Sequence, residues 1–238
     1  MKATVVIPTL NEEENLRGCL GALARQTLED FEVIVVDGGS SDGTAEVAEG
    51  FGARVITLRE RGIARARQAG FEAAKAELIA STDADSIPPP HWLERLLSPF
   101  SDPHVVGVYG LTRHESVKDL GARIFRLWQR LHHSLGLPIF LGPNFAVRKE
   151  AFLEVGGFRE PDGSFPTGYP EADDFLLGLK LVRLGKVVFL PDLYVYTSPR
   201  RLSAKNFPRE LVLYARRYFR LLRWHYTGKL AFCDHGKA

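Results

Sequence analysis

The first third of the chain repeats one pattern: a short run of β-branched and apolar residues, a turn, and then a stretch with helical periodicity. This alternation is typical of a parallel sheet whose crossovers are helices. The runs that we predict as strands are Thr4–Ile7, Phe31–Val36, Arg54–Thr57 and Glu77–Ser81. Because these runs are nearly all apolar, we expect helices on both faces of the sheet. Ligands of such sheets bind beyond the carboxyl ends of the strands, so the residues after each strand are the first candidates for chemistry.

The rest of the chain is less regular but still alternates helical and extended patterns. Asn11 is placed to cap the first helix, which carries Leu16, Leu20 and Leu23 on one face. The other predicted helices are Thr44–Gly50, Ile63–Ala76, Trp92–Leu97, Lys118–Leu135, Glu171–Leu184 and Phe207–Tyr226, and the other predicted strands are Val105–Leu111 and Val187–Leu190. A Gly/Pro-rich stretch occupies Gly136–Asn144, and no internal repeat or low-complexity linker marks a domain boundary.

Composition narrows the class of protein. The chain has 238 residues and is 45% hydrophobic, enough to bury a substantial core. Its 31 basic and 29 acidic side chains leave a formal charge of +2, so we expect no nucleic-acid partner. Cys19 and Cys233 are too far apart in the sequence to suggest a disulfide framework or a metal-binding pair. Because the first apolar run is too short for a signal peptide and no run reaches about 18 apolar residues, we expect a cytoplasmic protein, with contact at the inner face of the membrane as an open alternative.

The turn after the second predicted strand carries Asp37, followed by a Gly/Ser-rich stretch up to Thr44. A structural interpretation is a tight turn that caps the next helix. In the functional interpretation, the Asp37 carboxylate projects from the carboxyl edge of the sheet and accepts from a base N–H or a ribose hydroxyl. The first strand is not followed by G-x-G-x-x-G, and Pro8 lacks the N–H that a phosphate-binding turn uses, so the pattern is not a dinucleotide fingerprint.

Two carboxylates spaced by one residue, Asp83 and Asp85, follow the fourth predicted strand. Such a pair can share Mg²⁺ or Mn²⁺, with diphosphate oxygens and water as the remaining ligands. The metal would neutralise a nucleoside diphosphate as it leaves. Because the same spacing is common in ordinary acidic loops, the pair gains its weight from the motifs around it.

Several motifs follow one another in a characteristic order. They are Pro8-x-x-Asn11-Glu12, Val35–Thr44, Arg61-Gly62, Ala66-Arg67 with Gly70, Asp83-Ala84-Asp85, Gly142–Arg148, Gly156-Gly157-Phe158, and Asp173-Asp174 before a Leu-rich helix. Over roughly residues 3 to 198, this series resembles the inverting nucleotide-sugar glycosyltransferases of the GT-A fold, family 2.

The resemblance implies a Rossmann-like α/β domain with a mostly parallel sheet over residues 1–200. Residues 1–101 would bind the nucleotide and residues 102–200 the acceptor. Residues 201–238 would form a basic, amphipathic helical extension packed on this domain.

The resemblance also implies a reaction and its residues. A sugar would move from a nucleoside-diphosphate sugar to a hydroxyl of a saccharide, a lipid-linked molecule or a small metabolite. Nucleotide contacts would come from Pro8, Thr9, Asn11, Glu12, Asp37, Arg67 and Asp83, and acceptor contacts from Gly142, Asn144, Glu171 and Asp173. Asp85, together with Asp83, would hold Mn²⁺ or Mg²⁺. Arg67 also has a structural interpretation, as a solvated arginine on a helix rich in basic residues.

Asp174 matches the position of the family's general base, which takes the acceptor proton in a single displacement that inverts the anomeric configuration. The family usually has Glu-Asp here, whereas this chain has Glu171-Ala172-Asp173-Asp174, so Asp173 and Glu171 stay open as alternatives. A structural interpretation is a helix N-terminus whose acids favour the helix dipole. The family also often has a histidine ligand after its last strand, whereas this chain has Tyr196-Thr197-Ser198-Pro199.

The last predicted helix is basic and amphipathic. Its arginine stripe consists of Arg209, Arg216, Arg220 and Arg223, and its apolar stripe of Leu211, Tyr214, Tyr218 and Leu222. One interpretation is a surface helix that packs on the domain. The other is attachment to anionic lipid headgroups, which would bring the active site to a lipid-linked acceptor. Arg200 and Arg201 could instead bind a phosphate of the product or acceptor.

Two other functions fit parts of the sequence. A retaining transferase on the same fold would share the nucleotide half and the D-x-D pair but would not need Asp174 as a base. A noncatalytic nucleotide-binding protein would need none of Asp83, Asp85 and Asp174, so their joint presence argues against it. The sugar is not specified by the sequence, because selectivity depends on side-chain positions around the pocket.

Overall fold

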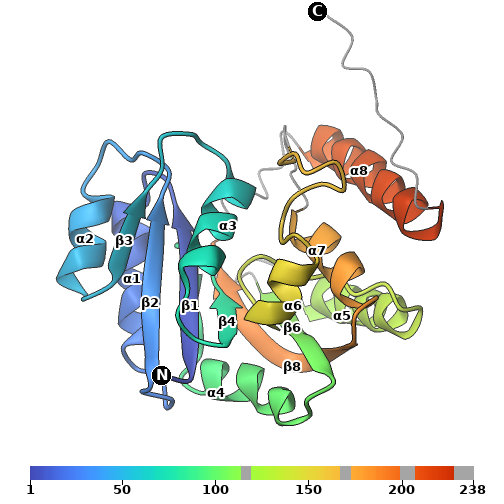
Figure 1. The fold of residues 1–238 in the computed structure, drawn as a ribbon, viewed down its shortest axis with the longest axis horizontal. Helices are drawn as coiled ribbons and strands as arrows, with labels where there is room; N and C mark the ends of the chain where they lie inside the picture. Colours follow the sequence, from blue (N-terminus) through green and yellow to red (C-terminus); the bar gives the residue numbers. More distant parts are fainter. Residues whose placement is uncertain (114–118, 167–172, 199–206, 228–238) are drawn as a thin grey trace, which may run out of the picture.

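The computed structural model describes residues 1–113, 119–166, 173–198 and 207–227, with side chains throughout except at 119–125 and 207–215. These residues form an α/β fold around one sheet (Figure 1). The strands of the described part are β1 Ala3–Thr9, β2 Phe31–Asp37, β3 Arg54–Thr57, β4 Leu78–Ser81, β5 Ser86–Ile87, β6 Val105–Arg113, β7 Phe145–Arg148 and β8 Lys186–Thr197. Across the sheet they lie in the order β3-β2-β1-β4-β7-β6-β8-β5.

The sheet is mixed and mostly parallel, which confirms the predicted fold class. β1 lies between β2 and β4 and is parallel to both, and β3 continues this parallel block beyond β2. β6 and β8 are also parallel, whereas β7 is antiparallel to β4 and β6, and β5 is antiparallel to β8. The carboxyl ends of β1, β2, β3 and β4 therefore meet at one edge of the sheet.

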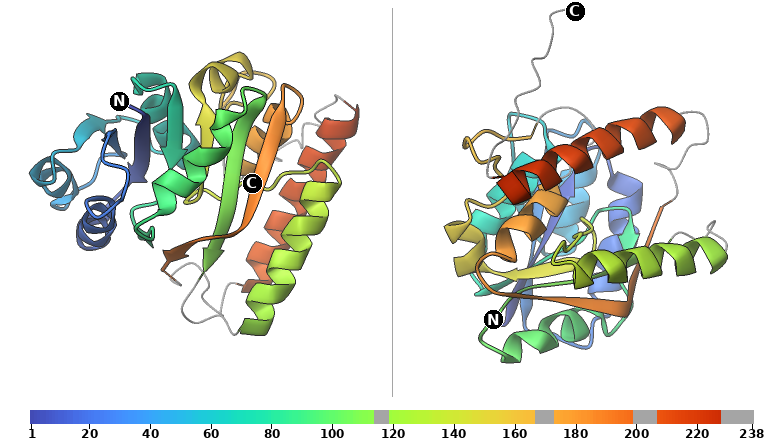
Figure 2. Two further views of the ribbon diagram at one scale, coloured as in Figure 1. Left: turned by 90° about the horizontal axis from the view of Figure 1, so that it is seen from below. Right: turned by 90° about the vertical axis from the view of Figure 1, so that its right-hand side faces the viewer.

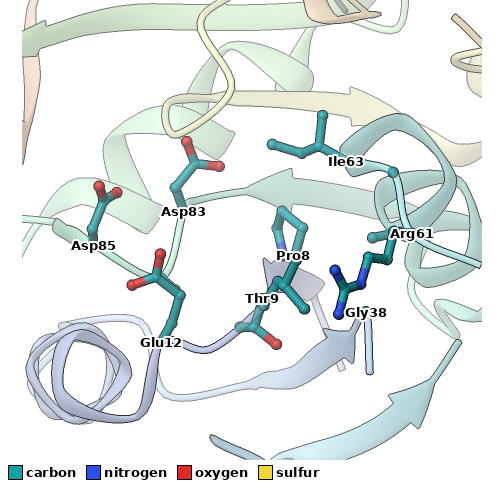
Figure 3. Close-up of a pocket in the computed structure, with 12 residues that line it drawn as sticks. Pro8, Thr9, Glu12, Gly38, Arg61, Ile63, Asp83 and Asp85 are labelled. Carbon is teal, nitrogen blue, oxygen red and sulfur yellow. The ribbon is translucent and has the colours of Figure 1, made fainter. Parts of the chain in front are cut away.

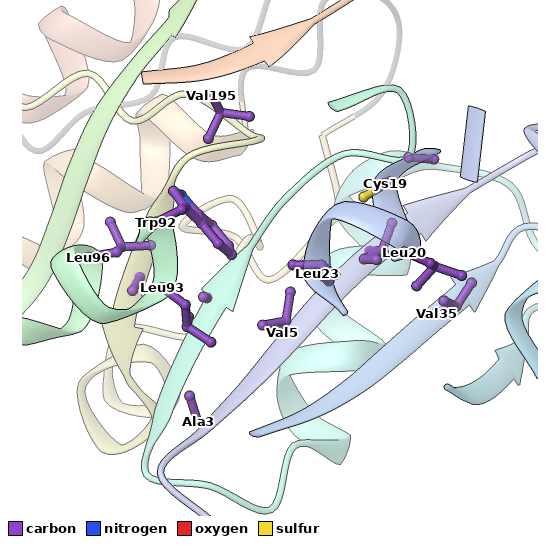
Figure 4. Close-up of a cluster of buried hydrophobic side chains, with 14 of the residues drawn as sticks. Ala3, Val5, Cys19, Leu20, Leu23, Val35, Trp92, Leu93, Leu96 and Val195 are labelled. Atoms are coloured by element: carbon purple, nitrogen blue, oxygen red, sulfur yellow. The ribbon is translucent and has the colours of Figure 1, made fainter. Parts of the chain in front are cut away.

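Helices cover both faces of the sheet, as the apolar strands predicted. The helices of the described part are α1 Glu13–Leu23, α2 Thr44–Gly50, α3 Ile63–Ala73, α4 Trp92–Leu97, α5 Asp119–Ser134, α6 Lys149–Glu154, α7 Asp173–Leu181 and α8 Phe207–Thr227, with a 3-10 turn at Ser98–Ser101. α1, α2 and α4 form a core on one face, which includes Trp92 (Figure 4). α3, α6 and α7 form the core of the other face around Phe71. β1 serves both, because Val5 and Ile7 belong to the first core and Val6 to the second.

The main differences from the sequence prediction concern β5, β7, α6 and β8. β5 was not predicted, because it has only 2 residues. β7 and α6 were not predicted, because they follow each other directly and no turn signal separates them. β8 continues to Thr197, although its apolar run ends at Leu190. Pro191 cannot donate to a ladder, and it lies where the register against β6 shifts, between the pairs Tyr109–Phe189 and Leu111–Tyr194.

α8 packs on α7 through an apolar cluster. Leu221 and Trp224 are buried in one group with Phe175, Leu176 and Leu179 of α7. No helix of the described residues is both long and apolar enough to cross a membrane. Residues 199–206, where the predicted domain boundary and Arg200 and Arg201 fall, lie outside the described residues.

The predicted arginine stripe of α8 is divided, because its members have different environments. Arg220, together with Arg217, pairs with the buried Glu160 of the loop after α6. Arg216 and Arg223 are exposed. The side chains of Arg209, Leu211 and Tyr214 lie outside the described part. The prediction of one continuous arginine stripe that attaches to lipid is therefore wrong in including Arg220. This side chain forms an ion pair within the fold instead.

Asn144 ties together elements from across the fold. Its side chain is fully buried. Its Nδ2 donates to the carbonyls of Leu111 at 2.8 Å and Leu193 at 3.0 Å, and its Oδ1 accepts from Trp92 Nε1 at 2.9 Å. The amide thus connects β6, β8 and α4 directly before β7 begins.

We expect Asn144→Ala to lower the free energy of unfolding by about 3 kcal/mol or more, because it removes three buried hydrogen bonds, among them the one to the Trp92 indole N–H. Urea denaturation measures this loss. Asn15→Ala is the control, since Asn15 is only half-buried and donates to Glu12, the residue before α1, and we expect it to cost less than about 1 kcal/mol. Equal losses in the two variants would contradict the structural role of Asn144.

Candidate active site

A cleft of about 270 Å³ opens at the carboxyl ends of β1, β2 and β4 (Figure 3). Its walls are formed by Pro8, Thr9, Leu10, Glu12, Gly38, Arg61, Gly62, Ile63, Ala66, Asp83, Ala84 and Asp85. These residues follow three neighbouring strands or begin α3, so the parallel topology brings them together. The cleft lies where ligands of parallel sheets bind, and it contains the predicted nucleotide contacts Pro8, Thr9, Glu12 and Asp83.

Asn11 joins the turn after β1 to the turn after β2. It adopts a left-handed backbone conformation, with φ at +54°, which asparagine tolerates better than most residues. Asn11 Oδ1 accepts from the N–H of Ser41 at 2.8 Å, and the Asn11 N–H donates to Ser40 Oγ at 2.8 Å. The Glu12 N–H donates to Thr44 Oγ1 at 2.9 Å. Asn11 thus fixes the rim of the cleft, and the Glu12 carboxylate extends toward Asp83 and Asp85 (Figure 3).

Asp37 is buried, in contrast to the projecting carboxylate that its position after β2 suggests. Its carboxylate accepts from the Ser40 N–H at 3.1 Å and from the Ser40 hydroxyl. Its carbonyl accepts from the Leu58 N–H at 2.8 Å. Asp37 therefore organises its own turn, and its contact with a nucleoside stays a prediction.

The aspartates after β4 have different neighbours. Asp83 is half-buried and accepts from Arg67 Nη2 at 2.8 Å. Asp85 lies beside the end of β8, where Thr197 Oγ1 donates to Asp85 Oδ1 at 3.4 Å and the Ser198 N–H donates to the Asp85 carbonyl at 3.2 Å. The segment in which the family often has a histidine is therefore in contact with Asp85. Thr197 was missed as a site residue, because the only signal in the sequence was the missing histidine.

The oxygen donors on the cleft wall fit a hard divalent cation. Asp83, Asp85 and Glu12 all line the same cleft. Among the described residues, no group of three or more His, Cys, Asp or Glu side chains is arranged to hold a metal by itself. Mg²⁺ and Mn²⁺ commonly bind through one or two carboxylates plus phosphate and water. The two aspartates thus fit a metal that a diphosphate helps to hold.

Arg67 joins Asp83 to the acidic pair of α7. Its side chain is only 3% exposed, whereas that of Arg65 on the same helix is 39% exposed, so Arg67 is not a solvated surface arginine. Nη2 donates to Asp83, and Nη1 donates to Asp173 Oδ2 at 2.9 Å. Gly142 leaves the space for this guanidinium, because a Cβ at residue 142 would lie 2.0 Å from Nη2. The expected contact of Arg67 with a base or diphosphate stays a prediction.

Asp174, the predicted base, lies beside this bridge. Its Oδ2 accepts from the Gly142 N–H and its Oδ1 from the Phe175 N–H, both at 2.8 Å. Burial and the neighbouring Asp173 carboxylate raise the pKa of Asp174 to about 7, although Arg67 and the two N–H donors act in the opposite direction. A carboxylate with a pKa near neutrality is well suited to accept a proton.

The residues predicted to contact the acceptor have different environments in the structure. The Gly142 N–H holds Asp174, and Asp173 is buried in its ion pair with Arg67. Asn144 has no exposed side-chain surface, so a structural role replaces its expected contact with an acceptor. Glu171 lies outside the described residues.

Comparison with known proteins identifies similar chains. The model of the family described as "Glycosyl transferase family 2" matches residues 4–156. Glycosyltransferase AglE of Haloferax volcanii is 39% identical over 106 residues, which cover 41% of this chain and 35% of that protein. Undecaprenyl-phosphate 4-deoxy-4-formamido-L-arabinose transferase of Serratia proteamaculans is 36% identical over 126 residues, 48% of this chain and 39% of that protein. The matched part thus spans little more than a third of each of these relatives.

Solved structures with the same fold contain nucleotides and Mn²⁺. The mannosyltransferase PcManGT from Pyrobaculum calidifontis, in complex with GDP-Man and Mn²⁺, has a TM-score of 0.67 and 26% identity, covering 82% of this chain and 56% of that one. The fold also matches glucosyl-3-phosphoglycerate synthase from Mycobacterium tuberculosis, in complex with Mn²⁺, UDP and phosphoglyceric acid. That match has a TM-score of 0.67 and 23% identity, and it covers 99% of this chain and 80% of that one.

We expect Arg67→Met to lower the free energy of unfolding by about 3 to 5 kcal/mol, because it removes the cation between two largely buried carboxylates. Chemical denaturation of both proteins at neutral pH measures the difference. Arg65→Met is the matched control on the same helix, since the exposed pair of Arg65 with Glu60 should contribute less than about 1 kcal/mol. A loss no larger in Arg67→Met than in this control would refute the bridge as a stabilising contact.

Proposed function

The chain belongs to glycosyl transferase family 2, and we propose that it transfers a sugar from a nucleoside-diphosphate sugar to an acceptor oxygen with inversion at the anomeric carbon. The observation that carries this proposal is the bridge through Arg67. It connects Asp83 of the nucleotide cleft to Asp173, the neighbour of Asp174 in the acidic pair of α7. A donor seated at Asp83 and Asp85 would therefore present its sugar toward Asp174.

The donor nucleotide would lie in the cleft at the ends of β1 and β2. Thr9, Gly38, Glu12 and Arg61 line this part of the cleft. The diphosphate would lie at the end of β4, beside Asp83 and Asp85. The relatives bind different donors, since PcManGT is in complex with GDP-Man and Staphylococcus aureus TarS with UDP-GlcNAc.

Asp85, with Asp83, would hold the divalent cation. When bound, such an ion supplies positive charge that stabilises a nucleoside diphosphate as a leaving group. Thr197 would orient Asp85 through their hydrogen bond. Arg67 fixes Asp83 through their ion pair.

Asp174 would act as the general base. The acceptor oxygen forms a bond to the anomeric carbon, its proton passes to Asp174, and the bond from that carbon to the diphosphate oxygen breaks with its electron pair. Asp173 is less suited to this role, because it is buried and bonded to Arg67. Asp174 is half-buried, and two backbone N–H groups fix its orientation.

We expect a nucleoside-diphosphate sugar with Mn²⁺ to raise the melting temperature of the wild-type chain, since a ligand at one hundred times its Kd adds about 2.7 kcal/mol to stability. A thermal-shift screen of UDP, GDP, CDP and TDP sugars tests this. Asp85→Ala and a chelator should each remove most of the shift, whereas Asp30→Ala, at the far end of β2, should retain it. If no donor shifts the melting temperature, the proposed function is wrong. An equal shift without metal would refute only the assignment to Asp85.

We expect kcat/KM of the free enzyme to rise about tenfold per pH unit below pH 7 and to level off above it, because Asp174 must be ionised to act as a base. Asp174→Asn should lower the rate by about 10² to 10⁴ and lose this dependence. Asp192→Asn, an exposed residue in β8, should leave both the rate and the profile unchanged. Initial rates from acid to alkaline pH measure the profile. A retained anomeric configuration, seen by proton coupling in the product, would rule out the single displacement.

A further inference from the structure

An apolar face of α5 is exposed. Leu127 and Leu131 of α5 and Leu135, directly after it, follow one another at intervals of four residues, and Leu127 is 69% exposed. The Leu135 N–H still bonds to the Leu131 carbonyl, so the helical path continues to this residue. Trp128 is also exposed beside them. Residues four apart lie on the same face of a helix, so these side chains form one ridge.

The outward face of α8 is aromatic and basic. Phe219 is 66% exposed and Tyr226 is 68% exposed, and their separation of seven residues places them on one face. Arg216 and Arg223 lie on the same face and are exposed. Arg220 lies at the edge of this face next to Arg217, and both pair with Glu160.

The two helices lie on one side of the molecule. Figure 2 shows them together as the outer layer in its left view and facing the viewer in its right view. Tyr218 of α8 and His132 of α5 join them through a hydrogen bond of 2.6 Å. We name as the α5–α8 face the exposed residues Leu127, Trp128, Arg130, Leu131, Leu135, Arg216, Phe219, Arg223 and Tyr226.

The charged side chains of this face are all basic. Neither residues 126–135 nor residues 216–227 contain an aspartate or a glutamate, whereas the chain as a whole is nearly balanced. Single exposed apolar residues are ordinary on a protein surface, but an apolar ridge flanked by arginines without acids is typical of helices that lie in a lipid interface. Anionic headgroups would complement Arg130, Arg216 and Arg223, and the acyl boundary would take the leucines and Phe219.

We propose that the α5–α8 face docks on the surface of an anionic phospholipid membrane. The α5–α8 face differs from the single arginine stripe that the sequence of α8 suggests. The leucines of α5 belong to the face, and Arg220 does not.

The inner side of α8 contacts the residue next to the candidate base. Tyr218 stacks on Phe175, with ring centroids 5.3 Å apart and planes 12° from parallel, and Phe175 follows Asp174 in the chain. A docked α8 would therefore hold Asp174 close to the lipid surface. As a consequence that rests on the proposed function, the acceptor would be a lipid that presents a phosphate or hydroxyl oxygen at the headgroup level.

The test is co-sedimentation of the full chain with vesicles of phosphatidylcholine alone, or with about one third phosphatidylglycerol. We expect binding to the anionic vesicles that weakens as salt increases. Arg216→Glu with Arg223→Glu should weaken it by more than about tenfold, and Leu131→Ser with Phe219→Ser by about tenfold. Arg25→Glu with Phe51→Ser is the matched control, since both residues are exposed near α1 and α2, and it should bind like the wild type.

The altered side chains are exposed, so melting temperature and donor-nucleotide binding should stay at wild-type values in every variant. The proposal is overturned if the chain binds neither kind of vesicle. It is also overturned if the variants of α5 and α8 bind as well as the wild type. A wild-type dimer in light scattering that Leu131→Ser with Phe219→Ser dissociates also overturns it, because a second copy would then cover the face. Vesicle binding does not depend on sugar transfer, so its failure and the failure of the proposed function are separate results.

Discussion

The guanidinium of Arg67 is almost inaccessible to water, and burying such a charge costs several kcal/mol unless partners of opposite charge surround it. Its two carboxylate partners come from distant parts of the chain, Asp83 at the end of β4 and Asp173 at the start of α7. The bridge forms only when α3, β4 and α7 all occupy their native positions. The nucleotide cleft and the acidic pair are therefore held in register by one side chain that neither reacts nor faces the solvent.

Asp174 lies next to the bridge formed by Arg67. Its ionised form, which the proposed reaction needs, is the form that burial disfavours. Because the folded state raises the pKa of Asp174 from 3.8 to about 7, the contribution of this group to stability falls as the pH rises from about 4 to about 7 and then levels off. The N–H groups of Gly142 and Phe175 offset part of that cost. A site that keeps a costly carboxylate in this way is typical of residues retained for chemistry.

Much of the fold could be predicted from local sequence. β1, β2, β3 and β4 are runs of apolar residues with turns between them, and the helices that join them show clear periods, so the parallel block was predicted nearly to the residue. β7 continues directly into α6 without a turn signal between them, and the end of β8 depends on a shift of register that no local pattern records.

The site was predictable in its residues but not in their contacts. The motif order indicated Asp83, Asp85 and Asp174, whereas the pairing of Arg67 with Asp173 joins residues 106 apart in the sequence. Asp37 and Asn144 stand in recognisable motifs, yet both are buried in hydrogen bonds of the fold itself. A motif marks a position as constrained and does not say whether a ligand or the protein imposes the constraint.

The close approach of Gly142 to Arg67 also restricts how this protein can change through evolution. Any side chain at residue 142 would occupy the volume of the guanidinium, so the glycine can be replaced only after residue 67 has become smaller. A smaller residue 67 would leave the carboxylates of Asp83 and Asp173 without their cationic partner. A variant with only one of these two positions changed is therefore expected to be unstable, whichever position changes first. Homologues that keep Asp83 and Asp173 are expected to keep both Arg67 and Gly142.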